Sequence, residues 1–235
     1  MQRNYEQESP AHEAQLRETV ARRESKPFAA GFYYDVYKVR DGEGRPAGKV
    51  AKIFRTDRPE RGVSWEQHAD TIEADHRFCA DHYPDFVPQT EFVRIPTPGG
   101  ERPFQFAAVQ EDASQTISVK NYLAELGDRN LPPEIYERLS QLLTQLEETL
   151  DREGKIPESF DLLGEKKDVV IDPQSGRVLL LDTNNVLERG TGHEFETWQG
   201  IVQEQPNLRD RMENRERTMR KLATARRTLE KYRSK

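Results

Sequence analysis

The feature that most limits the fold of this chain is the separation of strand-like segments from helix-like segments along its length. The first half is mainly aromatic, β-branched or alternating, with one helix-like segment inserted at 64–82. The second half holds the clearest helical pattern, at 133–153, where leucine and isoleucine recur on one face. Strand-rich and helix-rich stretches that follow one another are typical of the α+β class, which we therefore expect.

Local signals give the expected elements. In the segment 49–54, Val50, Lys52 and Phe54 share one face of a strand, because side chains alternate along it. Ser64 with Gln67 three residues later forms a capping-box pattern, and Gly154 is placed to end the helix before it. The expected strands are 28–39, 49–54, 86–95, 104–111, 168–171 and 177–181, and the expected helices are 11–24, 64–82, 114–126 and 133–153.

Charge is distributed unevenly along the chain. The net charge is -6, yet residues 207–235 contain eleven Lys/Arg and four Asp/Glu, which gives +7 there and leaves -13 for the remainder. A chain that is acidic overall is not a general nucleic-acid binder, so we expect no nucleic-acid partner. The basic segment has three interpretations: a cover over the acidic body, an oligomer or partner contact, or a nucleic-acid arm. The first is favoured, because the complementary charge is already present in the chain.

Cysteine content and hydropathy limit the cellular compartment in which we expect this protein. A single cysteine, Cys79, excludes a disulfide scaffold and a multi-cysteine metal cluster, and indicates a reducing compartment. We expect a cytoplasmic protein without a membrane partner, since no long apolar run is present. His76, Cys79 and His82 recur at intervals of three and could converge on zinc, but positions three apart drift around a helix, which favours packing roles.

Two acidic residues flank a predicted hairpin. Asp168 opens its first strand and Asp182 closes its second, which predicts neighbouring carboxylates with Cβ atoms about 5 Å apart. Adjacent carboxylates repel unless a cation or proton lies between them, and oxygen ligands suit Mg²⁺. Asp161 lies just upstream and could reach the same place. Acids beside a hairpin also serve as turn and cap residues, which is the alternative interpretation.

The order of these features resembles the protein-kinase-like superfamily over about residues 26–187. Residues 28–39, FAAGFYYDVYKV, are similar to a glycine-rich loop that has lost some of its glycines. Gly31 matches one glycine of that loop, and Val36 matches the valine that packs on adenine. KVAKIF resembles the strand that carries the phosphate-binding lysine, with Lys52 at that position. The resemblance implies a two-lobed protein-kinase-like fold with a reduced C-terminal lobe and a charged C-terminal helix.

The resemblance extends through the following segments. Glu73 takes the place of the glutamate that pairs with the lysine, with Glu66 as its substitute, and VQEDA at 109–113, which includes Glu111, resembles the hinge between lobes. The implied organisation is an N-terminal helical extension, an N-lobe, a reduced helical C-lobe with the catalytic hairpin, and a basic C-terminal helix, over residues 1–26, 27–111, 112–206 and 207–235.

The three acids acquire roles from the same resemblance. Asp161 would be the catalytic aspartate that orients or deprotonates the acceptor hydroxyl, Asp168 would replace the metal-binding asparagine, and Asp182 in DTN would be the metal-binding aspartate. ATP and Mg²⁺ are the implied cofactors. The implied activity is that of a divergent protein Ser/Thr kinase, with a small-molecule kinase as the nearest variant.

Departures from the family pattern favour an alternative, a pseudokinase-type module that binds nucleotide or a partner without transfer. Tyr34 replaces a loop glycine, and Ser159 and Phe160 precede Asp161 where kinases have His-Arg. The Ala-Pro-Glu segment is absent, and about fifty residues follow Asp182. The presence of Lys52, Asp161 and Asp182 together favours catalysis.

Overall fold

A computed structural model describes residues 10–30, 34–55, 64–99, 102–157, 162–163, 168–183, 186–190 and 212–233. Helices and strands are both abundant in these ranges, so the expected α+β class is confirmed. The chain divides into two compact units. Unit 1 comprises residues 1–59 and 89–112, and unit 2 comprises residues 60–88 and 113–235. The helix 65–82 thus belongs to unit 2, whereas the sequence-based division grouped it with the N-terminal sheet.

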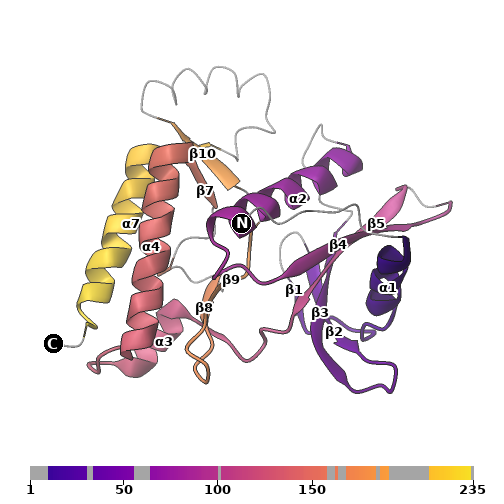
Figure 1. Cartoon of the computed structure of the whole chain (residues 1–235), viewed down its shortest axis with the longest axis horizontal. Helices are drawn as coiled ribbons and strands as arrows, with labels where there is room; N and C mark the ends of the chain where they lie inside the picture. Colours follow the sequence, from indigo (N-terminus) through magenta and orange to yellow (C-terminus); the bar gives the residue numbers. More distant parts are fainter. Residues whose placement is uncertain are drawn as a thin grey trace. The chain divides into compact units, whose positions relative to one another are not determined.

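Unit 1 is an antiparallel sheet with a helix against one face (Figure 1). Its five strands follow the order β1-β2-β3-β5-β4, so β3 is central. The elements are α1 (Pro10–Ala21), β1 (Ala29–Ala30), β2 (Tyr34–Arg40), β3 (Pro46–Phe54), β4 (Thr90–Pro96) and β5 (Phe104–Glu111).

The two faces of β3 differ as the alternation of its residues predicts. Ala51 and Ile53 pack with Leu16 and Val20 of α1 in one hydrophobic cluster. Lys52 lies between them in sequence and therefore on the other face of the pleated sheet. The sheet thus has one face buried against α1 and a second face that carries the lysine.

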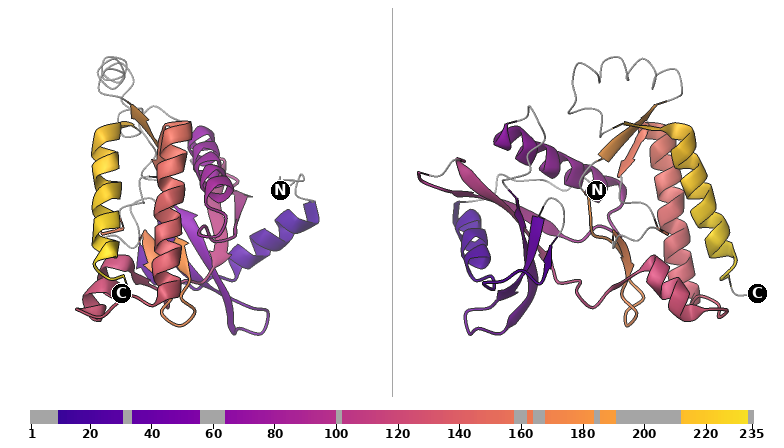
Figure 2. Two further views of the ribbon diagram at one scale, coloured as in Figure 1. Left: turned by 60° about the vertical axis from the view of Figure 1, so that its left-hand side comes forward. Right: turned by 180° about the vertical axis from the view of Figure 1, so that it is seen from behind.

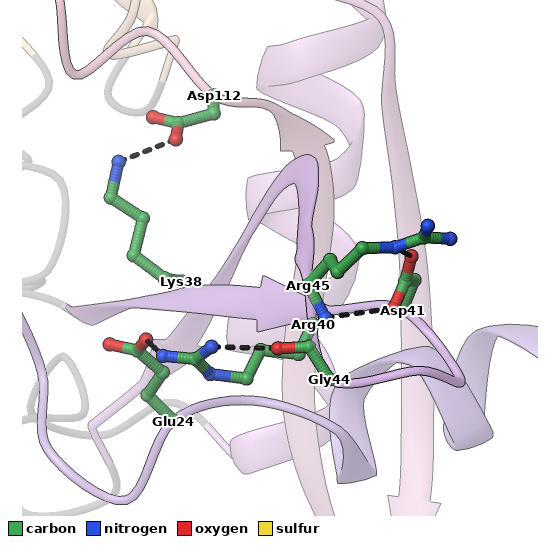
Figure 3. Close-up of polar contacts among 7 residues, drawn as sticks. All are labelled: Glu24, Lys38, Arg40, Asp41, Gly44, Arg45 and Asp112. Atoms are coloured by element: carbon green, nitrogen blue, oxygen red, sulfur yellow. Dashed lines mark hydrogen bonds and ion pairs between the residues drawn. The ribbon is translucent and has the colours of Figure 1, made fainter.

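The turn between β2 and β3 is held by polar contacts (Figure 3). Asp41 accepts the backbone N–H of Arg45 at 2.9 Å and its side-chain Nε at 3.0 Å. Arg40 donates to the Gly44 carbonyl at 2.7 Å and to Glu24 at 2.7 Å. The backbone N–H of Arg45 is the main reason that the pKa of Asp41 lies below its usual value. These bonds fix the turn, and with it the pairing of β2 with β3.

Unit 2 contains the remaining helices and two small sheets. One sheet has the order β6-β8-β9 and is antiparallel; the other has the order β11-β10-β7, with β10 parallel to β11. The elements are α2 (Trp65–His82), β6 (Ile117–Ser118), α3 (Val119–Leu126), α4 (Pro133–Glu153), β7 (Lys155–Pro157), β8 (Val169–Ile171), β9 (Val178–Leu180), β10 (Val186–Gly190), β11 (Met212–Asn214) and α7 (Arg215–Glu230).

The long helix α4 has the bounds that the sequence pattern predicts. Its apolar stripe is almost fully buried in the core of unit 2. Gly154 ends it in the left-handed conformation with φ of 69°, which glycine adopts without steric cost. No helix in the described part of the chain, α4 included, is long and apolar enough to cross a membrane. The buried stripe consists of Ile135, Leu139, Leu142, Leu143, Leu146 and Leu150.

The basic C-terminal helix α7 lies beside α4 and runs antiparallel to it (Figures 1 and 2). Arg215 pairs with Asp151 at 2.5 Å, and Arg226 pairs with Glu147 at 2.7 Å. Because exposed ion pairs stabilise little, the apolar residues of α7 carry most of the packing energy. The interpretation of this segment as a cover over the acidic body is confirmed for residues 215–230. The buried apolar residues of α7 are Leu222, Ala225 and Leu229.

One predicted strand starts later than expected. Strand β4 begins at Thr90, not at Phe86, because the preceding residues form a turn in which Phe86 donates its N–H to the Tyr83 carbonyl at 2.9 Å. Pro84 and Pro88 flank Phe86 and have no N–H to offer a strand ladder. Phe86 is fully buried, so its apolar character reflects the core and not a strand.

Candidate functional site

Lys52 lies at the centre of the sheet of unit 1. It is half-buried in β3, with Val36 of β2 and Ala108 of β5 directly opposite it on either side. Directly opposed residues project from the same face of a sheet, so these three side chains are neighbours. The Lys52 ammonium lies 4.8 Å from the centre of the Tyr34 ring, a cation–π distance.

The face that carries Lys52 is rich in aromatic rings. Phe54 lies opposite Tyr34, with ring centres 5.6 Å apart, and it also contacts Phe106 at 4.8 Å. Phe106 stacks on Phe92 at 5.5 Å with an interplanar angle of 7°. Phe54 and Phe106 are buried. Lys52 is therefore a half-buried cation on an apolar, aromatic sheet face, which is an unusual place for lysine.

The predicted hinge segment lies at the end of β5. Glu111 is half-buried and lies opposite Lys49, and the chain leaves unit 1 after Asp112. Asp112 donates its N–H to the Gly48 carbonyl at 2.9 Å and pairs with Lys38 of β2 at 2.5 Å (Figure 3). Lys38 and Asp112 are far apart in the sequence, so no local pattern could have revealed this ion pair.

The hairpin β8–β9 brings Asp168 and Asp182 to the same end, with a register that differs by one residue from the predicted one. Val169 pairs with Leu180, and Leu181 donates its N–H to the Asp168 carbonyl at 2.8 Å. Asp168 therefore lies opposite Leu181, and the expectation that it directly opposes Asp182 is wrong.

The turn of this hairpin explains the register. Asp172 and Arg177 close it through a backbone bond of 2.9 Å, and Gly176 adopts φ of 69°. The Asp172 carboxylate accepts the Ser175 hydroxyl at 2.6 Å and the Gln174 N–H at 2.9 Å. The Ser175 hydroxyl is the first cause, and the Gln174 N–H the second, of a pKa of Asp172 below its usual value. This side-chain-stabilised turn, together with the glycine, sets the pairing of the two strands.

Both predicted metal ligands are half-buried carboxylates beyond the last paired residues of the hairpin. Within the described residues, no three His, Cys, Asp or Glu side chains are grouped closely enough to hold a metal ion. Asp161, the third acid, and Gly31 of the predicted loop lie outside the described residues. The metal site formed by Asp168 and Asp182 stays a prediction.

Three residues of α2 anchor the segment that follows Asp182. His76 Nδ1 and Thr183 Oγ1 share a hydrogen bond of 2.9 Å, and Cys79 donates from Sγ to the Thr183 carbonyl at 3.8 Å. Asp75 accepts the backbone N–H of Val186 at 3.2 Å. We call Asp75, His76 and Cys79 the anchor residues. They contact Thr183, which is next to a predicted metal ligand, and Val186.

The anchor residues make these contacts in the interior of unit 2, away from water. Asp75 and His76 are 7% and 8% exposed, and Cys79 is fully buried. Burial, and then the nearby carboxylates of Asp75 and Asp182, raise the pKa of the Cys79 thiol well above its usual value. The thiol therefore stays protonated and acts as a hydrogen-bond donor.

His82 does not join the anchor residues. It donates from Nδ1 to the Phe78 carbonyl at 2.8 Å and stacks on the Phe78 ring with centres 4.2 Å apart. His76 is bonded instead to Thr183. The two histidines of the zinc alternative therefore have separate partners.

Sequence reasoning considered His76 and Cys79 only as zinc-alternative or packing residues, and it missed the anchoring role that they share with Asp75, although a signal existed. Asp75 and His76 lie on the face of α2 that also carries Ile72 and Cys79, all of them buried. Polar side chains on the buried face of an amphipathic helix need partners inside the protein. The sequence could not identify Thr183 and Val186 as those partners.

Replacing Asp75 by alanine is expected to lower the free energy of unfolding by about 2 kcal/mol, because the buried N–H of Val186 would lose its acceptor. Asp75→Asn retains a side-chain oxygen and should lose clearly less. Urea denaturation measures both losses, provided that the dependence of the free energy of unfolding on urea concentration is the same in each variant. Equal losses for the two variants would contradict the role assigned to this hydrogen bond.

The predicted partners of Lys52 belong to unit 2. Glu73 is half-buried and Glu66 is exposed, both on α2. Lys52 belongs to unit 1. The ion pair between Lys52 and either glutamate therefore remains a prediction.

Comparison with known proteins adds no assignment. No protein-family model matches this chain, and no curated protein is significantly similar to it.

Proposed function

We propose that this chain is an ATP- and Mg²⁺-dependent phosphotransferase with a two-lobed, protein-kinase-like fold, acting on a protein hydroxyl. The observation that carries the proposal is the position of Lys52. It is a half-buried lysine on the central strand of an antiparallel sheet, on the face opposite α1 and between Val36 and Ala108. An ammonium on such a face is suited to an anionic ligand whose apolar part packs beside it.

In this proposal the residues of unit 1 bind the nucleotide. Val36 and Ala108 provide small apolar surface for a purine ring, and Lys52 binds the phosphates next to it. Glu111 lies at the end of β5, where the backbone of the predicted hinge could bond the edge of the ring. Glu73 would orient Lys52 through an ion pair, as the family resemblance implies.

The residues of unit 2 supply the acids. Asp168 and Asp182 fit Mg²⁺ in donor type, because both offer carboxylate oxygens at one end of a single hairpin. Bound there, Mg²⁺ would neutralise the phosphate charge during transfer. Asp161 would orient the acceptor hydroxyl and take its proton. The anchor residues would hold Asp182 in place through Thr183.

A second candidate is a nucleotide-binding module without transfer activity. The observation that favours it is the Tyr34 ring, which lies 4.8 Å from the Lys52 ammonium at a position where kinases have glycine. A bulky side chain limits close approach of the loop backbone to phosphate. Nucleotide binding without phosphate transfer to any protein would identify this second function.

A thermal-shift experiment tests the proposal. We expect ATP with Mg²⁺ at about a hundredfold excess over Kd to raise the unfolding temperature by about 8 °C, since binding to the folded state alone contributes about 2.7 kcal/mol. ATP without Mg²⁺ should raise it much less. Asp182→Asn should remove the Mg²⁺-dependent part of the shift.

The matched control is Asp85→Asn, which removes an exposed carboxylate elsewhere in unit 2. On addition of ATP with Mg²⁺, the unfolding temperature of this variant should rise as much as that of the wild type. Identical unfolding temperatures for the wild type with and without ATP and Mg²⁺ would overturn the proposal. A shift that persists unchanged in Asp182→Asn would remove Asp182 from the metal site.

A further inference from the structure

A groove of about 280 Å³ lies on unit 2 between α7 and the residues Leu162 and Leu163. Its aliphatic lining residues are these two leucines and Ala225, of which Leu162 and Ala225 are almost fully buried and Leu163 is half-buried. We call it the α7 groove. The seven residues that line it are Leu162, Leu163, Arg217, Arg220, Lys221, Thr224 and Ala225.

The basic residues of the α7 groove occupy one side of the helix. Arg217, Arg220, Lys221 and Thr224 follow intervals of three, one and three, which place them along one helical face. Arg217 and Arg220 are exposed and Lys221 is half-buried. Arg215 and Arg226 pair with acids of α4 and do not line the groove. The groove thus has an aliphatic floor and a rim with three cationic side chains.

We propose that the α7 groove binds an acidic peptide segment that places one aliphatic side chain on the leucine floor. The three cations complement carboxylates on either side of that residue. The volume suits one or two side chains and is below the usual range of pockets for drug-sized ligands. Nucleic acid fits less well, because the lining contains no aromatic ring on which a base could stack.

The groove gives the proposed reaction a class of substrate. Leu162 follows Asp161, the proposed acceptor-orienting residue, directly in the sequence. A peptide held on Leu162 and Leu163 would therefore be a phosphoacceptor with acidic residues near its hydroxyl. This last step rests on the proposed function, whereas peptide binding to the groove does not.

The test measures binding without ATP. The probe is a fluorescein-labelled peptide with the central sequence Glu-Glu-Leu-Glu-Glu, and its anisotropy is followed on addition of the full chain. We expect binding that weakens as salt is added, and that is lost when lysine replaces each glutamate or serine replaces leucine. Arg220→Glu should weaken it about tenfold, since reversal turns an attraction into a repulsion.

Lys231→Glu is the matched control, because it makes the same charge change just beyond α7 at an exposed position that does not line the groove. It should bind the probe within about twofold of wild type, since an exposed charge outside the groove acts weakly through screened solvent. Equal weakening in both variants, or no binding by the wild type, would overturn the proposal. Displacement of the peptide by unlabelled single-stranded DNA of equal charge at equal concentration would also overturn it, in favour of nucleic acid.

The two proposals fail separately. If the peptide does not bind but ATP with Mg²⁺ still raises the unfolding temperature, the groove assignment alone is wrong. If the peptide binds as expected and no nucleotide shift occurs, the groove stands and the phosphotransferase proposal falls.

Discussion

Lys52→Met is expected to reduce the proposed phosphate transfer by roughly a hundredfold or more, the loss that follows removal of one preorganised charged group from a transition state. Methionine keeps most of the unbranched side chain that packs between Val36 and Ala108. The sheet should therefore stay folded, with an unfolding temperature near that of the wild type. The measurement is transfer of radiolabelled phosphate from ATP to a protein acceptor, or to the chain itself, at saturating Mg²⁺.

The chain provides a matched control three residues away. Lys49 lies on the same strand but on the opposite face, is exposed, and pairs across the sheet with Glu111. Lys49→Met removes the same charge from β3 and should keep nearly full activity. If the two variants lose activity equally, the loss reflects damage to the strand, and Lys52 has no special part in transfer.

Leu142→Ala is expected to lower the free energy of unfolding by about 3 kcal/mol and the unfolding temperature by about 10 °C. Leu142 is fully buried in the middle of α4, at the centre of the core of unit 2. Removing its side chain loses apolar burial and leaves a cavity that surrounding helices can fill only in part. Calorimetry or urea denaturation measures the change.

Met219→Ala on α7 is the comparison. Met219 is 38% exposed, so its truncation should change the free energy of unfolding by about 0.5 kcal/mol or less. A small effect at Leu142 as well would mean that α4 does not form the core around which unit 2 folds. Together the two substitutions separate loss of packing from loss of helix propensity, since alanine favours a helix at both sites.

The sequence predicts elements well where local chemistry determines them. The apolar stripe of α4, the glycine after it, and the capping box of Ser64 and Gln67 before α2 all depend on residues a few positions apart. The alternation in β3 likewise separates Lys52 from Ala51 and Ile53 without knowledge of any partner strand. In each case the signal repeats within one helical turn or one pleat.

Elements whose partners lie far away in the chain were harder to predict. Strands β7, β10 and β11 have three to five residues, too few to show a period, and they form only by pairing with each other. The hairpin β8–β9 was predicted, but its register was not, because the Asp172 turn displaces the pairing by one residue.

In the candidate site, too, features that depend on nearby residues could be predicted and features that depend on distant partners could not. Lys52 could be assigned to one face of a strand, whereas the hydrogen bond between His76 and Thr183 joins residues that no sequence pattern connects. Each polar group of α2 was visible in the sequence, but its burial was not. Burial is a property of the folded chain, and it gives Asp75 and His76 their importance.

The packing of α7 changes what the end of this chain can be used for. Leu222, Ala225 and Leu229 complete the interior of unit 2, and Tyr232 accepts the Leu131 N–H through its carbonyl at 2.8 Å. A shortened protein ending before Arg215 would lose part of its hydrophobic interior and would expose the leucines of α4 to water. Recruitment of a partner by this helix must therefore be studied with single charge reversals on its outer side. An affinity tag is better attached at a place where it leaves the last turn of the helix intact.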